Sequence, residues 1–163
     1  MDLAALDARL THIEDLEAIK ALKARYCEIC DDDHNPEDII SIFTEDGVWE
    51  GKGIGKAEGH KEIRSLFERF QKHMSFSQHM VMNPLIEIEG TVASARWCFF
   101  GPFTFRTKEG GEQAMWQSTR YHERYEKSGG VWKIKHLLIA GPSMSATFEE
   151  GWARPKKTGS AKK

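Results

Sequence analysis

The chain divides into a helical first third and a strand-rich second half, and this order limits its fold more than any other feature. Apolar residues in the first 30 positions recur at steps of three and four, including Leu3, Leu6, Leu10, Ile19 and Tyr26. This period predicts two consecutive amphipathic helices with charged residues on the opposite face. Helices first and strands last is the order of an α+β protein.

A break follows the helical third at residues 31–36, Asp-Asp-Asp-His-Asn-Pro. Proline disfavours helix at the preceding residue and favours a helix start, which predicts a short third helix over residues 37–43. A turn and a short strand over residues 44–50 and a glycine-rich loop over residues 51–59 are expected next. Apolar residues between 63 and 70 then return to helical spacing.

Four strand-like runs complete the chain, at residues 75–89, 91–106, 112–125 and 131–139. Glycine-containing segments separate them at hairpin distances, which predicts an antiparallel meander. The helices are expected to cover one face of a curved sheet, and the curvature leaves a pocket between the two layers.

Composition bounds the class of protein. The 163 residues, 40% of them apolar, suit one domain, which we place at residues 1–145, with residues 146–163 as a partly extended or disordered tail. The net charge of −2 argues against a nucleic-acid partner or an anionic membrane. Since no apolar run approaches the ~20 residues of a membrane span, we expect a cytoplasmic protein.

Cysteine and glycine patterns point to no cofactor. Cys27 and Cys30 have the spacing of a redox or zinc half-site, but they fall inside a predicted helix without a second Cys or His pair, so we expect core cysteines. The histidines show no helical spacing to carboxylates typical of a metal site, and the glycine-rich loop matches no nucleotide-binding motif. We therefore predict no metal and no organic cofactor.

Two polar residues are candidates for chemistry. Asp31 ends the second predicted helix, and His79 lies within an apolar strand. A carboxylate on one imidazole nitrogen fixes the tautomer and stabilises the cation, leaving the other nitrogen free to take a proton from a substrate. The alternative is a satisfied core histidine and an acid in an exposed acidic run.

Strand alternation supplies candidates for the pocket wall. On the run at residues 112–125, Met115, Gln117 and Tyr121 share a face that we assign to the helices, whereas Arg120 and His122 share the other. An inward tyrosine hydroxyl needs a hydrogen-bond partner, so Tyr121, like Tyr26 of the second helix, is a pocket candidate.

Several segments together resemble the SnoaL-like proteins of the NTF2-like superfamily. The resemblance runs over residues 5–142 and is carried by residues 15–31, 46–49 (Asp-Gly-Val-Trp), 79–84 (His-Met-Val-Met-Asn-Pro), 120–121 and 129–134. It implies an NTF2-like cone, in which N-terminal helices pack on a highly curved antiparallel or mixed sheet that encloses a pocket.

The resemblance also implies a function. In dehydratases and a dehydrochlorinase of this family, an aspartate at the end of the long helix and a histidine on the first long strand form the catalytic dyad, and these positions fall on Asp31 and His79. The expectation is a cofactor-independent lyase acting on an apolar cyclic, steroid-like or polyketide-like substrate. Predicted substrate-binding residues are Tyr26, Tyr121, Trp49, Met82, Trp97, Phe99, Met115 and Gln117.

Other functions remain open at this point. An isomerase or an aldol cyclase would use the same dyad, and the superfamily includes non-catalytic binding or assembly modules and the scaffold subunits of ring-hydroxylating dioxygenases. The expected partners are a small apolar organic substrate and further copies of the chain, in a trimer or a dimer.

Overall fold

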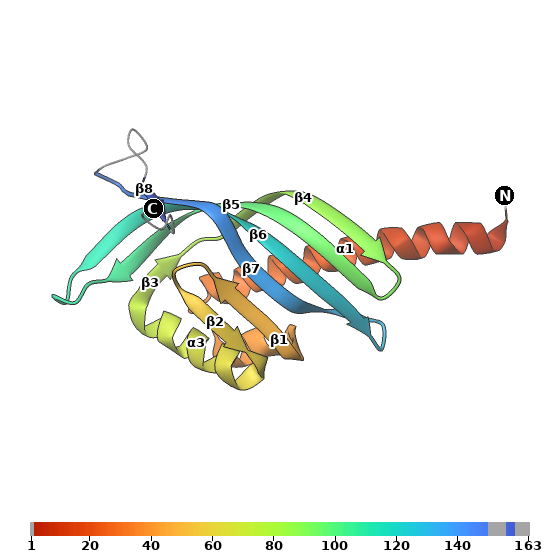
Figure 1. Cartoon of the computed structure of the whole chain (residues 1–163), viewed down its shortest axis with the longest axis horizontal. Helices are drawn as coiled ribbons and strands as arrows, with labels where there is room; N and C mark the ends of the chain where they lie inside the picture. The colour runs from red at the N-terminus through yellow and green to blue at the C-terminus, as the bar shows by residue number, and fades with distance from the viewer. Residues whose placement is uncertain (1, 150–155, 159–163) are drawn as a thin grey trace, which may run out of the picture.

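One curved sheet and three helices make up the fold in a computed structural model that describes residues 2–149 and 156–158. The long strands arch over the first helix, and the smaller elements lie beneath the middle of the arch (Figure 1). The elements are α1 (Leu3–Asp31), α2 (Pro36–Ser41), β1 (Phe43–Gly51), β2 (Gly55–Glu58), α3 (Gly59–His73), β3 (Met74–Ser77), β4 (Met80–Glu89), β5 (Val92–Arg106), β6 (Glu112–Ser128), β7 (Val131–Thr147) and β8 (Lys156–Thr158).

The sheet is mixed. Its described strands run in the order β2-β1-β7-β6-β5-β3, with β4 also paired to β5 and β8 to β7. The β1–β7 pair is parallel and the other pairs are antiparallel. This arrangement confirms the predicted α+β class, with helices on one side of a strongly curved sheet.

The first 30 residues form one helix, not the two that we predicted. α1 is 29 residues long and has no glycine or proline between Ile13 and Leu16 that would end it. Its core-facing residues, including Ile19 and Tyr26, begin only at Asp15. At 100° per residue, the apolar stripe of the first turns points roughly 160° away from this face. The apolar residues therefore move to another face of the same helix after Ile13, and this shift, not a break between two helices, explains their spacing.

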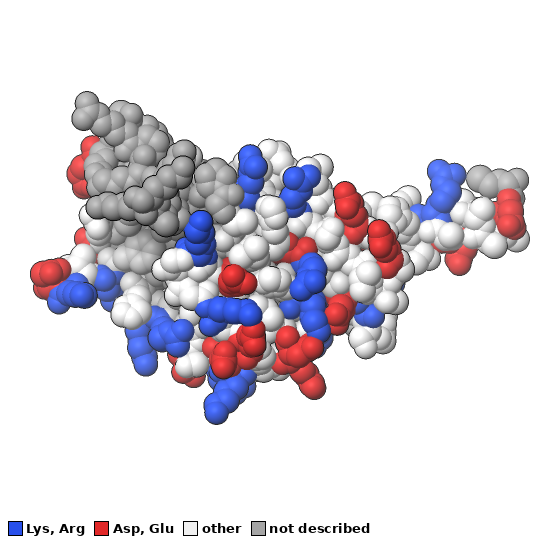
Figure 2. Space-filling view, in the orientation of Figure 1, with Lys and Arg blue, Asp and Glu red and all other residues white. Residues whose placement is uncertain are grey.

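The N-terminal turns of α1 project from the body of the protein (Figure 1), and Figure 2 shows them free of other residues. Leu3, Leu6, Leu10 and Ile13 are therefore exposed. The predicted homo-oligomer, in which such apolar surface is covered, stays a prediction. None of the described helices combines the length and the apolar character that crossing a bilayer requires.

Strand boundaries differ from the prediction in three places. β1 begins at Phe43 and includes residues 44–47, where we expected a turn. At these residues the register of β1 with β7 shifts. β2 forms within the expected glycine-rich loop and pairs with β1. β7 continues to Thr147, and β8 pairs with it. The rest of the expected tail, residues 150–155 and 159–163, lies outside the described residues.

The core contains a buried ion pair between the helix and the sheet. Lys23 on α1 and Glu123 on β6 have fully buried side chains, and the Lys23 Nζ lies 2.6 Å from Glu123 Oε1. The Tyr125 hydroxyl donates to the other oxygen of Glu123. Because each charge has a partner, the pair fixes how α1 sits against the sheet without leaving an unpaired buried ion.

Removing one partner should therefore be costly. Lys23→Met leaves the Glu123 carboxylate buried without a cation and should lower the free energy of unfolding by about 3–5 kcal/mol in urea titrations. The double variant Lys23→Met/Glu123→Gln should recover much of this loss. The control is Lys20→Met, since Lys20 forms an exposed pair with Glu17. A loss at Lys23 no larger than that at Lys20 would contradict this account.

Candidate active site

The end of α1 meets the break between β3 and β4 at a single carboxylate. Asp31 is the last residue of α1, and its Oδ1 lies 2.6 Å from Nδ1 of His79. The backbone N–H of His79 also donates to Asp31, at 2.8 Å from Oδ2 and 3.0 Å from Oδ1. The carboxylate thus holds both the ring and the main chain of His79, which restricts the direction of the imidazole.

The position of His79 depends on a close backbone approach. Gln78 donates its N–H to the Pro102 carbonyl at 3.1 Å, and a Cβ added to Gly101 would lie 2.0 Å from the Gln78 carbonyl oxygen. Only glycine fits at this point of β5. Gly101 and Pro102 therefore allow the chain that pairs with β5 to break between β3 and β4. At this break His79 is directed toward α1.

Contacts and burial define the protonation state of His79. The side chain is 7% exposed, and its ring lies 5.2 Å from the ring centroids of Phe99 and Phe103. Burial lowers the pKa of His79, and the Asp31 contact opposes this shift only in part. Since a carboxylate can only accept, the short contact requires the proton on Nδ1 and leaves Nε2 as the basic nitrogen of the neutral ring.

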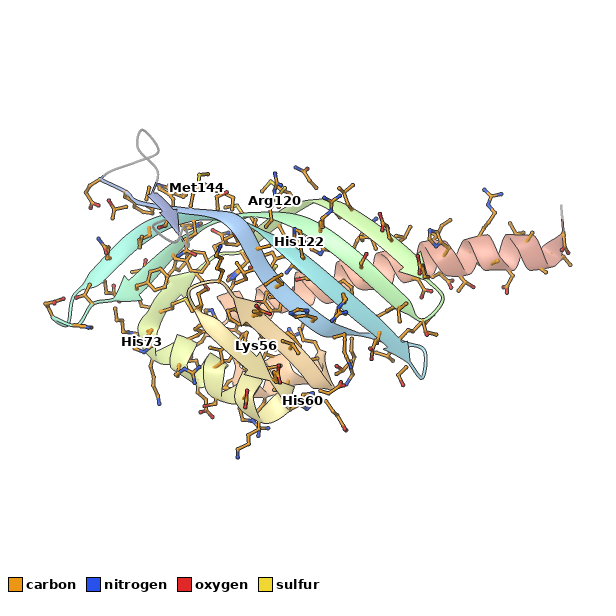
Figure 3. All side chains as sticks on the ribbon, viewed as in Figure 1. Lys56, His60, His73, Arg120, His122 and Met144 are labelled. Carbon is orange, nitrogen blue, oxygen red and sulfur yellow. The ribbon has the colours of Figure 1, made fainter. Side chains whose placement is uncertain are left out.

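The imidazole faces a cavity of about 570 Å³ between the helices and the sheet. This volume is in the range of pockets for small organic ligands. Aromatic residues supply much of the wall, namely Tyr26, Trp49, Phe67, Phe70, Phe99, Phe103, Phe105 and Tyr121. In Figure 3, His73 on α3 and Met144 on β7, which also line the cavity, mark two opposite sides of it.

Two tyrosine rings lie near the dyad and line the cavity. The Tyr26 ring lies 6.3 Å from the His79 ring and 6.2 Å from the Tyr121 ring. Trp49 Nε1 donates to the Tyr26 hydroxyl at 3.1 Å. Burial raises the pKa of both tyrosines well above the usual value, so both hydroxyls stay protonated and can donate to a bound oxygen atom.

The structure brings most of the predicted site residues together. Tyr26, Trp49, Phe99, Gln117 and Tyr121 line the cavity with His79. Asp31 approaches from the other side of the ring and lines a shallow outer depression that it shares with His79. The predicted faces of β6 are confirmed, since Tyr121 is buried whereas Arg120 and His122 lie on the outer face of the sheet (Figure 3).

Three predicted lining residues are corrected, because the described residues around the cavity do not include them. Met82 is 41% exposed, since strand alternation from His79 directs it to the opposite face. Trp97 is buried farther along β5, where it donates to the Tyr125 hydroxyl at 3.2 Å. Met115 is half-buried on β6 opposite Phe103, two residues before Gln117, where the described β6 part of the lining begins.

Sequence reasoning missed a second histidine at the site. His34 is 5% exposed, lines the cavity, and has its ring 6.3 Å from the His79 ring. Its φ of +55° places it in the left-handed region, in the turn between α1 and α2. Burial is the main cause, and the proximity of His79 the second, of a pKa of His34 that is lowered to about 4. The run of acids before Pro36 suggested an exposed turn and concealed this residue.

The Gly101 contact can be tested by adding one methyl group. Gly101→Ala should lower the free energy of unfolding by about 1–3 kcal/mol and displace His79, because the Gln78 carbonyl must move. Gly111→Ala is the matched control, since the nearest atom there lies 3.4 Å away. Equal stability of the two variants in urea titrations would rule out the proposed constraint.

The buried His34 predicts a pH dependence of stability. The unfolded chain binds a proton near pH 6.5 and the folded chain only near pH 4, so stability should fall as pH drops through this window. His34→Asn, which tolerates the left-handed conformation, should lose about 2–3 kcal/mol less than the wild type between these pH values. Urea titrations across the window measure this difference, with His12→Asn on the exposed part of α1 as control. Parallel losses in wild type and His34→Asn would contradict the assignment.

Comparison with known proteins identifies the class. Residues 11–137 match the family model of the SnoaL-like domain, so the chain belongs to this family. The predicted NTF2-like cone is confirmed by solved structures of similar fold. A proposed aromatic ring hydroxylase from Novosphingobium aromaticivorans is 27% identical with a TM-score of 0.72, over 82% of this chain and 94% of that chain.

Two further structures share the fold at lower identity. A proposed scytalone dehydratase from Novosphingobium aromaticivorans is 19% identical, with a TM-score of 0.74 over 85% of this chain and 90% of that chain. The hexachlorocyclohexane dehydrochlorinase LinA-type3 from Novosphingobium barchaimii is 18% identical, with a TM-score of 0.71 over 86% and 90%. Both are similar to this chain in fold.

Proposed function

We propose that this protein is a cofactor-independent lyase of the dehydratase type, acting on a largely apolar cyclic or polyketide-like substrate. The observation that carries the proposal is the contact of 2.6 Å between Asp31 and His79 at the wall of an aromatic cavity. A histidine fixed in one tautomer, buried and facing a space for a ligand has the features of a general base.

The chemistry follows from the positions of the polar atoms. Nε2 of His79 takes a proton from the carbon next to a substrate carbonyl, and Asp31 stabilises the imidazolium that forms. The hydroxyls of Tyr121 and Tyr26 donate to the carbonyl oxygen as it gains enolate character. When the enolate collapses, the bond to the β-hydroxyl breaks, the imidazolium returns the proton to it, and water leaves.

The electrostatics of the site support this assignment. Because burial lowers the pKa of His79, the ring is neutral at neutral pH and can accept a proton. His34 is neutral under the same conditions, so it adds no positive charge beside the base. Lys23 lies 3.5 Å from the ring centroid of Tyr121, but its charge is matched by Glu123.

A second reaction uses the same groups. If the enolate is protonated at another carbon or attacks a carbonyl carbon, the product is an isomer or an aldol ring and no water is lost from the first intermediate. The mass of the product distinguishes the loss of water from both of these reactions, because an isomer and an aldol ring keep the mass of the substrate. A purely binding or assembly function has less support, because it requires neither a clamped imidazole nor hydroxyl donors beside it.

The role of His79 as the base is tested by substitutions at the dyad, each with a matched control substitution outside it. His79→Gln and Asp31→Asn should each lower kcat/KM by roughly 10²-fold or more in a panel of cyclic β-hydroxy ketones, scored for loss of water. The controls are His122→Gln, on the outer face of the sheet, and Asp32→Asn, next to Asp31. Exchange of the α-proton of cyclic ketones in deuterated water, measured by NMR, reports the first step without a leaving group. Exchange and turnover that survive His79→Gln would remove the histidine from the mechanism.

A further inference from the structure

The charged residues around the cavity share one sign. Lys52, Arg69 and His73 belong to the lining, whereas none of its described residues is an aspartate or a glutamate. Lys52 lies in the turn between β1 and β2, and Arg69 and His73 lie in the C-terminal half of α3. All three are exposed, so they stand at the mouth while the aromatic residues and His79 form the inner wall.

Lys52 and Arg69 have no counter-ion among the described residues. In the described part of the chain, Lys52 and Arg69 take part in no ion pair or side-chain hydrogen bond. Of the neighbouring bases, Lys56 pairs with Glu58 and Arg64 pairs with Glu37. Lys61 also has no ion pair among the described residues, but unlike Lys52 and Arg69 it does not line the cavity. The helix dipole explains a histidine in the last turn of α3, but it does not explain a lysine in the β1–β2 turn.

The backbone of β8 brings more basic positions to the same wall. Lys156 and Lys157 are in register with Ser145 and Met144 of β7, and both of these β7 residues line the cavity. Of the described side chains, the cations of the lining therefore come from a turn, Lys52, and from a helix, Arg69, and they border a cavity with an apolar interior.

We infer that the ligand of this cavity is amphipathic, with an apolar ring system and an anionic group such as a carboxylate, sulfonate or phosphate. The ring system occupies the aromatic interior, and the anion lies at the mouth between Lys52 and Arg69. A planar guanidinium suits bidentate contact with such an anion. The inference rests on the cavity of the proposed function, and it narrows the substrate class from apolar to anionic.

The test compares probes that differ only in charge. Binding of naphthalene-2-carboxylate, naphthalene-2-sulfonate and naphthalene-2-carboxamide is measured by isothermal titration calorimetry on the full chain. The wild type should bind the two anions about tenfold more tightly than the amide, and high ionic strength should reduce this preference. Lys52→Gln and Arg69→Gln should each reduce the preference severalfold, and the double variant should abolish it without weakening amide binding.

Controls separate this inference from the catalytic proposal. Lys61→Gln removes the same charge from an exposed position of α3 outside the cavity lining and should leave the preference unchanged. His79→Gln should keep the preference, since binding does not require the base. Equal binding of anions and amide, a preference that survives the double variant, or no binding of any probe would overturn the inference. A loss of turnover in His79→Gln together with no anion preference would leave only the catalytic proposal standing.

Discussion

The Asp31–His79 contact joins the two parts of the fold and places the candidate base at the same time. The carboxylate at the end of a 29-residue helix accepts hydrogen bonds from both the main chain and the ring of one residue in the sheet. One carboxylate thus anchors the main chain just before β4 and, through Nδ1, the orientation of the ring. The same hydrogen bonds that close the domain therefore orient the reactive nitrogen.

Burial without unpaired charge sets the chemistry of the surrounding cavity. Desolvation keeps the phenols of Tyr26 and Tyr121 and the rings of His34 and His79 neutral, and the charge of the buried Lys23 is neutralised by Glu123. Enolate formation in such a setting places the new negative charge beside hydroxyl donors in an environment of low dielectric constant, where hydrogen bonds are stronger than in water. The uncompensated positive charge lies at the mouth, away from the base. This separation lets one cavity hold an apolar group, an anionic group and a neutral base.

The sequence predicts the parts of this account that depend on local pattern. Hairpin turns, the helix start at Pro36 and the inward face of β6 follow from spacing and alternation. The pairing of Asp31 with His79 came from a family resemblance, since 48 positions separate the two residues. The shift of the apolar stripe in α1 is present in the sequence, but only the structure shows that it belongs to one helix and not to two. The break at Gln78 depends on the tertiary contact with Gly101, which no local period encodes. His34 was missed because its backbone conformation, and not its neighbours in sequence, directs it inward.

The protonation of the His79 ring tests the central claim most directly, because it needs no substrate. Nitrogen-15 NMR of the labelled imidazole at neutral pH should show a protonated Nδ1, hydrogen-bonded to Asp31, and an unprotonated Nε2. Asp31→Asn should change the Nδ1 resonance and its proton, while Asp32→Asn should leave them unaltered. A ring that carries its proton on Nε2, or that is cationic at neutral pH, would contradict the assignment of His79 as the general base.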